Sequence, residues 1–307
     1  MEDSGDLGRS RAAATPDLQR AVLDWYASNR RDLPWRRTPS PYRTLVSEIM
    51  LQQTQVDRVR SAFESFVERF PTFEALGRAE RSDVVRAWAG LGYNRRAVHL
   101  HELARVVVER YGGCLPADYG SLTRLPGIGR YTAGAILSIV YGQDVPALDT
   151  NVRRVITRAC FSPTVAARPR DLAEMARDLV PEGRASDWNQ ALMDLGATVC
   201  LSRRPRCLIC PIRRWCSSAG RVASGPRSPG KQPPFASSMR YYRGRLLDEL
   251  RALPAGAVAP LPHIASRLAA AGVAEPPAGW ETVSRNLARD GLVRIDEGPE
   301  ALELGLA

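Results

Sequence analysis

The chain has 307 residues, of which 44% are hydrophobic and 25% charged, a composition typical of a globular protein with one or two domains. Its formal net charge of +10 favours polyanionic partners. No apolar run reaches the roughly 20 residues of a membrane span. Residues 1–15 lack the apolar segment of a secretory signal and are expected to form a disordered tail.

Residues 16–216 form a series of amphipathic patterns separated by short turns with Gly and Pro, and strand patterns are scarce. The expected helices are Leu18–Ser28, Thr44–Thr54, Val56–Arg69, Thr72–Ala79, Arg81–Ala89, Arg95–Tyr111, Asp118–Arg124, Tyr131–Tyr141, Val152–Ala159, Pro169–Leu179 and Trp188–Thr198. The pattern predicts an all-α fold with short loops.

A carboxylate stands inside the apolar run Leu45–Leu51 of the second expected helix. Glu48 lies either at the edge of this helix or in its buried face. Burial would raise its pKa, which suits a general acid.

The same helix is expected to end in polar residues. Their amide side chains could bind base edges and the preceding leucine could wedge into a duplex, whereas the simpler interpretation is a polar helix terminus. These residues are Leu51, Gln52, Gln53 and Thr54.

Two glycines occur in the turn Leu125–Gly129, between two expected helices. Gly127 and Gly129 permit a tight turn and a close approach of the backbone to a ligand. The next helix begins near Arg130, so its N-terminus points to the same place. The turn is therefore predicted to hold a DNA phosphate, although a lone Gly-x-Gly would favour an ordinary helix–helix turn.

Asp149 lies just before an expected helix and can cap it, which on its own is the simpler interpretation. The helix N-terminus would also keep its carboxylate ionised. An ionised Asp149 and a protonated Glu48 would divide the roles needed to break a glycosidic bond.

Four cysteines fall within seventeen residues in the pattern Cys-x6-Cys-x2-Cys-x5-Cys. Zinc sites usually pair two short-spaced cysteine units, and only one spacing is short here. The pattern therefore favours a [4Fe–4S] cluster over zinc or no metal. A cluster without an export signal fits a reducing cytoplasm. The ligands would be Cys200, Cys207, Cys210 and Cys216, and arginines in the loop, Arg203, Arg204 and Arg206, indicate that it faces an anion.

The composition changes after Cys216. Residues 217–238 are rich in Ser, Gly and Pro and predict a flexible basic linker, either solvated or following a phosphate backbone. Residues 239–307 predict three helices and two short strands, a pattern like a small winged-helix module, with a helical tail that does not contact DNA as the alternative.

The segment Asp32–Cys216 resembles the helix-hairpin-helix DNA glycosylases that carry an iron–sulfur loop, and among them the MutY-type adenine DNA glycosylases. The hairpin, Asp149 twenty residues after its last glycine, and the cysteine loop carry the resemblance. Its most specific strings are Arg31–Arg36, Ser47–Val56, Gly90–Tyr93 and Asn189–Ala197.

The resemblance implies two helical domains with the active site in the cleft between them. A six-helix barrel would comprise residues 42–145, and a cluster domain residues 16–41 and 146–216. The target base would be flipped out of the duplex. Many MutY-type enzymes carry a β-rich, Nudix-like domain after the linker, and residues 239–307 do not resemble it.

Residue roles follow from the same resemblance. Glu48 matches the acid that protonates the adenine ring, Asp149 the carboxylate that stabilises the sugar cation, and Asn151 its orienting partner. Thr150 stands where many relatives have Gly, so a slightly different turn is expected. Arg31, Trp35 and Gln190 match positions lining the adenine pocket. Leu51, Gln52, Gln53 and Tyr93 match residues inserted near the opposite base.

Tyr131 stands where the bifunctional endonuclease III pattern places its lyase lysine, and Lys231 is the single lysine of the chain. Tyrosine cannot form a Schiff base, so a monofunctional enzyme is predicted. The expected partner is double-stranded DNA with adenine opposite 8-oxoguanine or guanine, bound by a cytoplasmic, nucleoid-associated monomer. The alternatives are a thymine or uracil mismatch glycosylase and a non-catalytic DNA-binding regulator.

Overall fold

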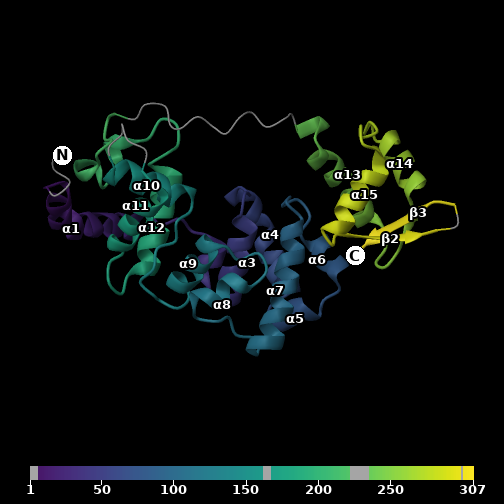
Figure 1. Ribbon diagram of the computed structural model, residues 1–307, viewed down its shortest axis with the longest axis horizontal. Coiled ribbons are helices and arrows are strands. Elements are labelled where there is room, and N and C mark those ends of the chain that lie inside the picture. The colour runs from purple at the N-terminus through teal and green to yellow at the C-terminus, as the bar shows by residue number, and fades with distance from the viewer. Residues whose placement is uncertain (1–5, 162–166, 222–234, 299) are drawn as a thin grey trace. The chain divides into compact units, whose positions relative to one another are not determined.

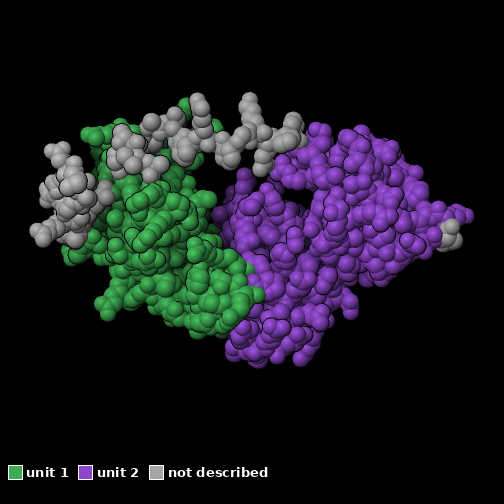
Figure 2. Space-filling view, in the orientation of Figure 1, with its two compact units in different colours: residues 1–45, 116–124, 128–228 green, residues 46–115, 125–127, 229–307 purple. Residues whose placement is uncertain are grey.

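The computed structural model describes residues 6–161, 167–221, 235–298 and 300–307. Contacts divide the chain into two compact units, coloured separately in Figure 2. Unit 1 comprises residues 1–45, 116–124 and 128–228, and unit 2 comprises residues 46–115, 125–127 and 229–307. The barrel and cluster domains expected from the sequence have other boundaries and stay a prediction. Within the described ranges, no helix has both the length and the apolar character needed to cross a membrane.

Unit 1 is helical. Its elements are α1 (Asp6–Asn29), α2 (Pro34–Arg37), α8 (Tyr119–Arg124), α9 (Arg130–Ile139), α10 (Thr150–Cys160), α11 (Pro169–Asp178), α12 (Ala185–Thr198) and the 3-10 turns η1 (Cys207–Ile209) and η2 (Arg213–Trp215). The helix α3 (Pro41–Leu51) continues from unit 1 into unit 2.

The helix α12 lies at the centre of unit 1 and packs against α1, α9 and α10. Its side chains Trp188 and Leu195 are fully buried in this core. The segments beside this core differ from the sequence expectation in two places. The helix α1 already begins at Asp6, inside the expected tail, where an Ala- and Arg-rich run favours helix. The α2 turn was not expected from the sequence.

Unit 2 contains α4 (Val56–Arg69), α5 (Phe73–Arg78), α6 (Arg81–Ala87), α7 (Arg95–Tyr111), η3 (Phe235–Ser237), α13 (Met239–Ala252), β1 (Ala259–Pro260), α14 (Leu261–Ala270), α15 (Gly279–Arg289), β2 (Val293–Glu297) and β3 (Leu302–Leu306). The helix α7 packs along α5 and α6. Phe66 meets the fully buried Trp88 edge to face, with ring centroids 5.8 Å apart. The expected helices of this region are present with shifts of a few residues at their ends.

Residues 239–307 form what we call the C-terminal module. Its three helices lie with the strands β2 and β3 in one part of the chain (Figure 1). The antiparallel sheet has the strand order β1-β3-β2. This is the connectivity of a winged helix, in agreement with the sequence pattern, and only the two-residue β1 was missed. The module does not stand alone, because its core is continuous with Val85 of α6 and Val98 of α7. Most of the expected linker, with Lys231, lies outside the described residues.

A buried ion pair network ties the start of the chain to α12. Asp194 is fully buried and accepts hydrogen bonds from Arg31 Nε (2.6 Å), Arg31 N (3.0 Å) and both terminal nitrogens of Arg36 (2.8 and 3.1 Å). Burial alone would raise the pKa of Asp194, but the hydrogen bonds and charges of Arg36 and Arg31 outweigh it and lower this pKa. The carboxylate is therefore held in its ionised form.

Replacing Asp194 by Asn should lower the free energy of unfolding by about 3–5 kcal/mol, because two guanidinium groups would lose their buried counter-charge. Asp32→Asn is the control, since its pair with Arg37 is exposed and should contribute about 1 kcal/mol or less. Denaturant unfolding at neutral pH measures both. Equal losses in the two variants would contradict the assigned importance of the Asp194 network.

Candidate functional site

Asp149 caps the N-terminus of α10, as the sequence predicts. Its Oδ1 accepts the Val152 N–H at 2.6 Å. The segment before it is fixed by Asn189 of α12, whose Oδ1 accepts the Ala147 N–H and whose Nδ2 donates to Val145 O, both at 2.9 Å. The structure thus shows what Asn189 does in the Asn189–Ala197 string, which the sequence alone does not reveal.

A hydrogen-bonded chain runs from Asp149 to the cysteine loop. Asn151 donates from Nδ2 to Asp149 Oδ2 at 3.0 Å, and its Oδ1 accepts from Arg154 Nη2 at 2.8 Å. Arg154 also donates to Gly196 O (2.6 Å) and to Cys200 O (2.7 Å). Sequence reasoning missed Arg154. Its place one helical turn after Asn151 was the available signal.

One glycine and one threonine also lie where α10 and α12 meet. A Cβ at Gly196 would lie 2.6 Å from Asn151 Cβ, so only glycine lets α12 approach α10 here. Thr150 is the first helical residue of α10 and is not among the described non-glycine residues with positive φ. A helical position accepts any L-residue, so Thr150 is accommodated here without strain, and the expected difference from relatives with glycine stays a prediction.

Two opposing effects set the pKa of Asp149. Burial raises the pKa of Asp149 above its ordinary value of 3.8. The hydrogen bonds from Val152 and Asn151 and the charge of Arg154 lower the pKa, but they offset only part of the burial effect. The helix cap favours the ionised form, as the sequence predicts, but it lowers this pKa by less than desolvation raises it.

Glu48 is buried in α3, with 6% of its surface exposed, so the buried alternative holds. The helix end beside it is held by Arg96 of α7, which donates from Nη1 to Ile49 O (2.8 Å) and Met50 O (2.7 Å). These carbonyls belong to the last turn of α3, where no intrahelical donor remains for them. Arg96 was not singled out from the sequence, although it lies three residues after Tyr93.

Arg96 also binds two turns, the one at residues 52–54 and the one before Tyr93. Its Nη2 donates to Thr54 Oγ1 (2.8 Å), Leu91 O (3.2 Å) and Gly92 O (2.9 Å). Its guanidinium lies 5.7 Å from the centre of the Tyr93 ring. Burial lowers the pKa of Arg96 to about 10, so it remains charged at neutral pH. One side chain thus joins the end of α3 to both candidate DNA-contacting turns.

These turns have strained backbones. The helix α3 ends at Leu51, so the residues 52–54 form a turn and not the helix end expected from the sequence. Gln53 and Tyr93 have φ of 56° and 46°, and Arg204 of the cysteine loop has 51°. They are the non-glycine residues with positive φ in the described part of the chain, and all three are predicted DNA contacts. Such strain concentrates at functional sites.

The hairpin turn has the expected geometry for close approach. Gly127 has φ of 77°, and a Cβ on it would lie 3.2 Å from His99 Cβ. Its carbonyl accepts from Gln52 Nε2 at 3.4 Å. Gly129 is the N-cap of α9, and both it and Arg130 are exposed. The N–H groups at the start of α9 are therefore available to an anion.

The residues predicted to line an adenine pocket are placed as follows. The Arg31 guanidinium is engaged by Asp194, and Trp35 is buried. Gln190 is half-buried and donates to Ser186 Oγ at 3.3 Å. Tyr131 is half-buried, with its hydroxyl 3.9 Å from Met193 Sδ. Arg31 thus has a structural partner that the sequence did not reveal, and the pocket role of Arg31, Trp35 and Gln190 stays a prediction.

All four cysteines of the loop line one cavity. Val155, Leu195 and Ile212 form apolar walls of the same cavity. No disulfide joins these cysteines. Burial, with the neighbouring cysteine charges, raises the pKa of Cys210 to about 11. Within the described ranges no group of three or more potential ligands is arranged for a single metal ion. The four thiols thus lie around one cavity, and the cluster itself stays a prediction.

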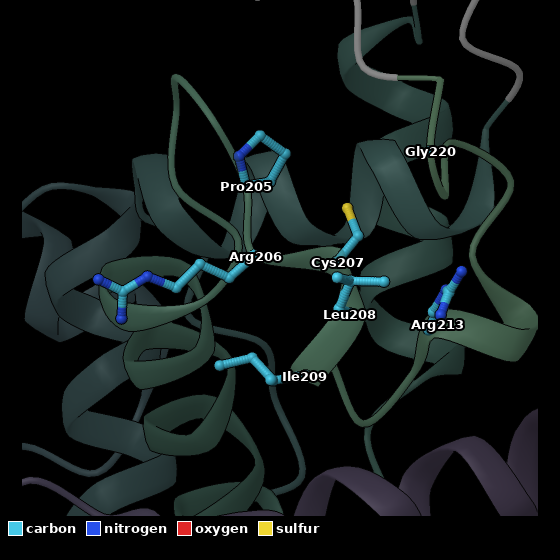
Figure 3. A pocket seen from close by; sticks show the side chains of 7 residues that line it. All are labelled: Pro205, Arg206, Cys207, Leu208, Ile209, Arg213 and Gly220. Carbon is cyan, nitrogen blue, oxygen red and sulfur yellow. The ribbon is translucent and has the colours of Figure 1, made fainter.

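A residue of α10 fixes the chain around Cys200, the first cysteine of the loop. Arg158 donates to Leu201 O (2.7 Å) and Ser202 O (2.9 Å), and its Nη1 lies 3.5 Å from Cys200 Sγ. The outer face of the loop forms a surface hollow, with Arg206 and Arg213 on either side of the exposed Leu208 and Ile209 (Figure 3). Arg203 and Arg204 are exposed as well.

The structure therefore groups the candidate site residues by unit. Unit 1 brings together Asp149, Asn151, Arg154 and the cysteine loop. Unit 2 brings together the Glu48 helix end, the 52–54 turn, Tyr93 and Gly127.

The chain is similar to known DNA repair proteins. Residues 46–182 match the family described as HhH-GPD superfamily base excision DNA repair protein. A protein of Mycolicibacterium smegmatis named adenine DNA glycosylase is 47% identical over 75% of this chain and 79% of its own. The human protein of the same name is 42% identical over 66% of this chain and 39% of its own. This chain belongs to the adenine DNA glycosylase family.

Solved structures agree on the fold. A thermostable thymine-DNA glycosylase aligns over 68% of this chain and all of its own, with a TM-score of 0.63 and 33% identity. An endonuclease III–DNA complex aligns over 68% of this chain and 96% of its own, with a TM-score of 0.59 and 20% identity, a likeness of fold alone. The predicted helix-hairpin-helix glycosylase fold is thus confirmed.

Asp149→Asn should raise the free energy of unfolding at about pH 8. A carboxylate whose folded pKa is raised contributes stability below its unfolded pKa and loses it as pH rises through the folded pKa. Asn removes the buried charge and keeps an oxygen for the Val152 N–H. The gain should therefore vanish as pH falls towards 3.8.

Denaturant unfolding across this pH range measures the effect, and Asp187→Asn controls for loss of an exposed negative charge. A variant less stable than the parent at pH 8 would show that capping by the charge outweighs its burial.

Proposed function

We propose that this protein is a monofunctional enzyme that hydrolyses the N-glycosidic bond of adenine mispaired with 8-oxoguanine or guanine in double-stranded DNA. The observation that carries this proposal is the buried carboxyl of Glu48 in a chain 47% identical to a named adenine DNA glycosylase. The enzyme acts as a monomer on cytoplasmic, nucleoid DNA.

Glu48 supplies the acid. Adenine is a poor leaving group until a ring nitrogen is protonated, and a carboxyl inside an apolar helix is suited to hold and deliver that proton. Arg96 fixes the end of α3 directly after Glu48, which supports a defined position for the carboxyl. Glu48 transfers its proton to a ring nitrogen of adenine. The N-glycosidic bond then breaks, and its electron pair leaves with the adenine.

Asp149 stabilises the positive charge that develops on the sugar as adenine departs, and water completes hydrolysis. Asn151 and Arg154 orient its carboxylate through the hydrogen-bonded chain described above. Val152 N–H fixes the second oxygen. This partly buried carboxylate contributes more strongly to catalysis than an exposed one would, because little water screens it.

The absence of a lyase step follows from residue chemistry. Tyr131 occupies the position of the lyase lysine, and Lys231, the single lysine of the sequence, is in the linker. The product is therefore an abasic site in an intact strand. The adenine pocket is assigned to Trp35, Gln190 and, through its stem, Arg31. The turns at Gln53 and Tyr93 are assigned to the opposite base.

The four loop cysteines hold a [4Fe–4S] cluster in this proposal, supported by the single cavity that all four line. Bound there, the cluster supplies positive charge that stabilises four deprotonated thiols and orders the loop. Arg154 and Arg158 fix the chain at Cys200 from α10. The ordered loop then presents Arg203, Arg204 and Arg206 to DNA phosphates.

Cys207→Ser should lower iron and sulfide from about four each per chain and weaken DNA binding by roughly tenfold, equivalent to about 1.4 kcal/mol. Cys114→Ser is the matched control, because Cys114 is exposed and lies outside the loop. Metal analysis and duplex titration measure the outcome. Full DNA affinity in a Cys207→Ser protein without iron would refute the ordering role.

Single-turnover base release from A:8-oxoguanine, A:G, T:G and U:G duplexes, each with and without alkali, tests the function. We expect release at adenine, fastest opposite 8-oxoguanine, with strand breaks only after alkali. Glu48→Gln should slow release roughly 10²–10⁴-fold. Asp149→Asn should lose turnover and keep DNA binding, whereas a non-catalytic regulator would bind DNA and show no turnover even in the parent protein.

A thymine or uracil mismatch glycosylase is the second candidate, favoured by the 33% identity to a solved thymine-DNA glycosylase. Release only from T:G or U:G would establish this second function and refute adenine specificity. Strand cleavage without alkali would refute the monofunctional assignment.

A further inference from the structure

The C-terminal module holds the first turn of α7. Arg251 of α13 donates from Nη2 to Asn94 Oδ1 at 2.9 Å and from Nε to Val85 O at 3.2 Å. Its side chain is only 11% exposed, so these bonds are little screened by water. Asn94 is the N-cap of α7 and directly follows Tyr93. A residue 157 positions further along the chain therefore holds the turn that presents Tyr93.

Other contacts make this attachment firm. Arg86 of α6 donates back to Arg251 O and to Pro254 O (3.1 Å). Asp290, at the end of α15, pairs with Arg243 of α13 and with Arg95 of α7, the latter at 3.6 Å. Beneath these polar contacts lies the apolar core that the module shares with α6 and α7.

The turn at Tyr93 needs such support. Its φ of 46° is unfavourable for a tyrosine, and strained residues persist only where the surroundings fix them. Arg96 fixes the turn from inside through Leu91 O and Gly92 O. Arg251 fixes it from the side of the module through Asn94. Tyr93 itself is 46% exposed, so its ring is available to a ligand.

The charge of the module favours a mechanical role over phosphate binding. Between Met239 and Ala307, eight arginines stand against nine carboxylates. The hairpin between β2 and β3, which would be the wing, carries Glu297 and Glu300. A surface that holds DNA phosphates needs excess positive charge, which this module lacks.

We propose that Arg251 is a positioning residue for opposite-base discrimination, through which the C-terminal module fixes Asn94 and thereby the backbone of Tyr93. The proposal rests on the proposed function, because discrimination presupposes adenine release. It gives the module a defined mechanical role, since the module then braces a turn of the catalytic part of the chain.

The test compares Arg251→Met with Arg245→Met in the full-length protein. Both residues lie on α13 and pair with Asp248, but Arg245 reaches no residue of α6 or α7 in the described contacts. Arg251→Met should reduce the ratio of release rates from A:8-oxoguanine and A:G about fivefold to tenfold. Arg245→Met should leave the ratio unchanged. Arg251→Lys should restore part of it.

A double-mutant cycle separates positioning from general destabilisation. If Arg251 acts through Tyr93, Arg251→Met should not reduce the ratio further in a Tyr93→Ala background. Additive losses, or an unchanged ratio with a lowered melting temperature alone, would overturn the proposal.

Hydrogen exchange provides a readout that does not depend on activity. Backbone amides of residues 90–96 should exchange faster in Arg251→Met than in Arg245→Met. Unchanged exchange there would overturn the proposal even in an active enzyme. A wild-type protein that releases no adenine would refute the proposed function, while the exchange experiment would still decide the role of Arg251.

Discussion

The buried guanidinium of Arg96 is the interaction on which unit 2 depends most. It donates to two carbonyls at the end of α3, to the hydroxyl of Thr54 and to two carbonyls of the turn before Tyr93. A buried charge without partners would cost several kcal/mol. The need to satisfy this one group therefore forces the α3 end and both strained turns into a single arrangement. Glu48 directly precedes the bonded carbonyls, so its backbone position is fixed by the same bonds.

Unit 1 uses the same device around Asp149. Arg154 connects Asn151, and through it Asp149, to Gly196 O and Cys200 O. The candidate sugar-stabilising carboxylate and the candidate cluster loop therefore share one rigid support. The cost is visible in Asp149, because burial outweighs its hydrogen bonds and raises its pKa. A carboxylate whose ionised form is disfavoured by burial is stabilised strongly by a nearby positive charge. The positive charge that develops on the sugar provides this stabilisation.

The sequence predicts the helices, the hairpin glycines and the cysteine set because each depends on local spacing. It also predicts Asp149 as a cap, which is a short-range property. Prediction from the sequence fails for properties that depend on burial by residues distant in the chain. The raised pKa of Asp149, the pairing of Arg31 with Asp194 and the end of α3 at Leu51 all depend on partners distant in the chain. Arg96, Arg154 and Arg251 were missed because an arginine in an amphipathic helix looks like any surface charge.

These arginines share a physical requirement. Each donates to two or more backbone or amide oxygens in different directions, which the planar fork of a guanidinium satisfies and a lysine ammonium does not match. Of the 43 basic residues in the sequence, 42 are arginine, so the chain has this group available at nearly every basic position. Functional turns with positive φ are not stable by themselves. In this protein, multidentate arginines from neighbouring helices, including one from the C-terminal module, hold such turns in place. In our proposal the module supports the Tyr93 turn through Arg251, and its near-neutral charge provides no excess positive charge for DNA phosphates.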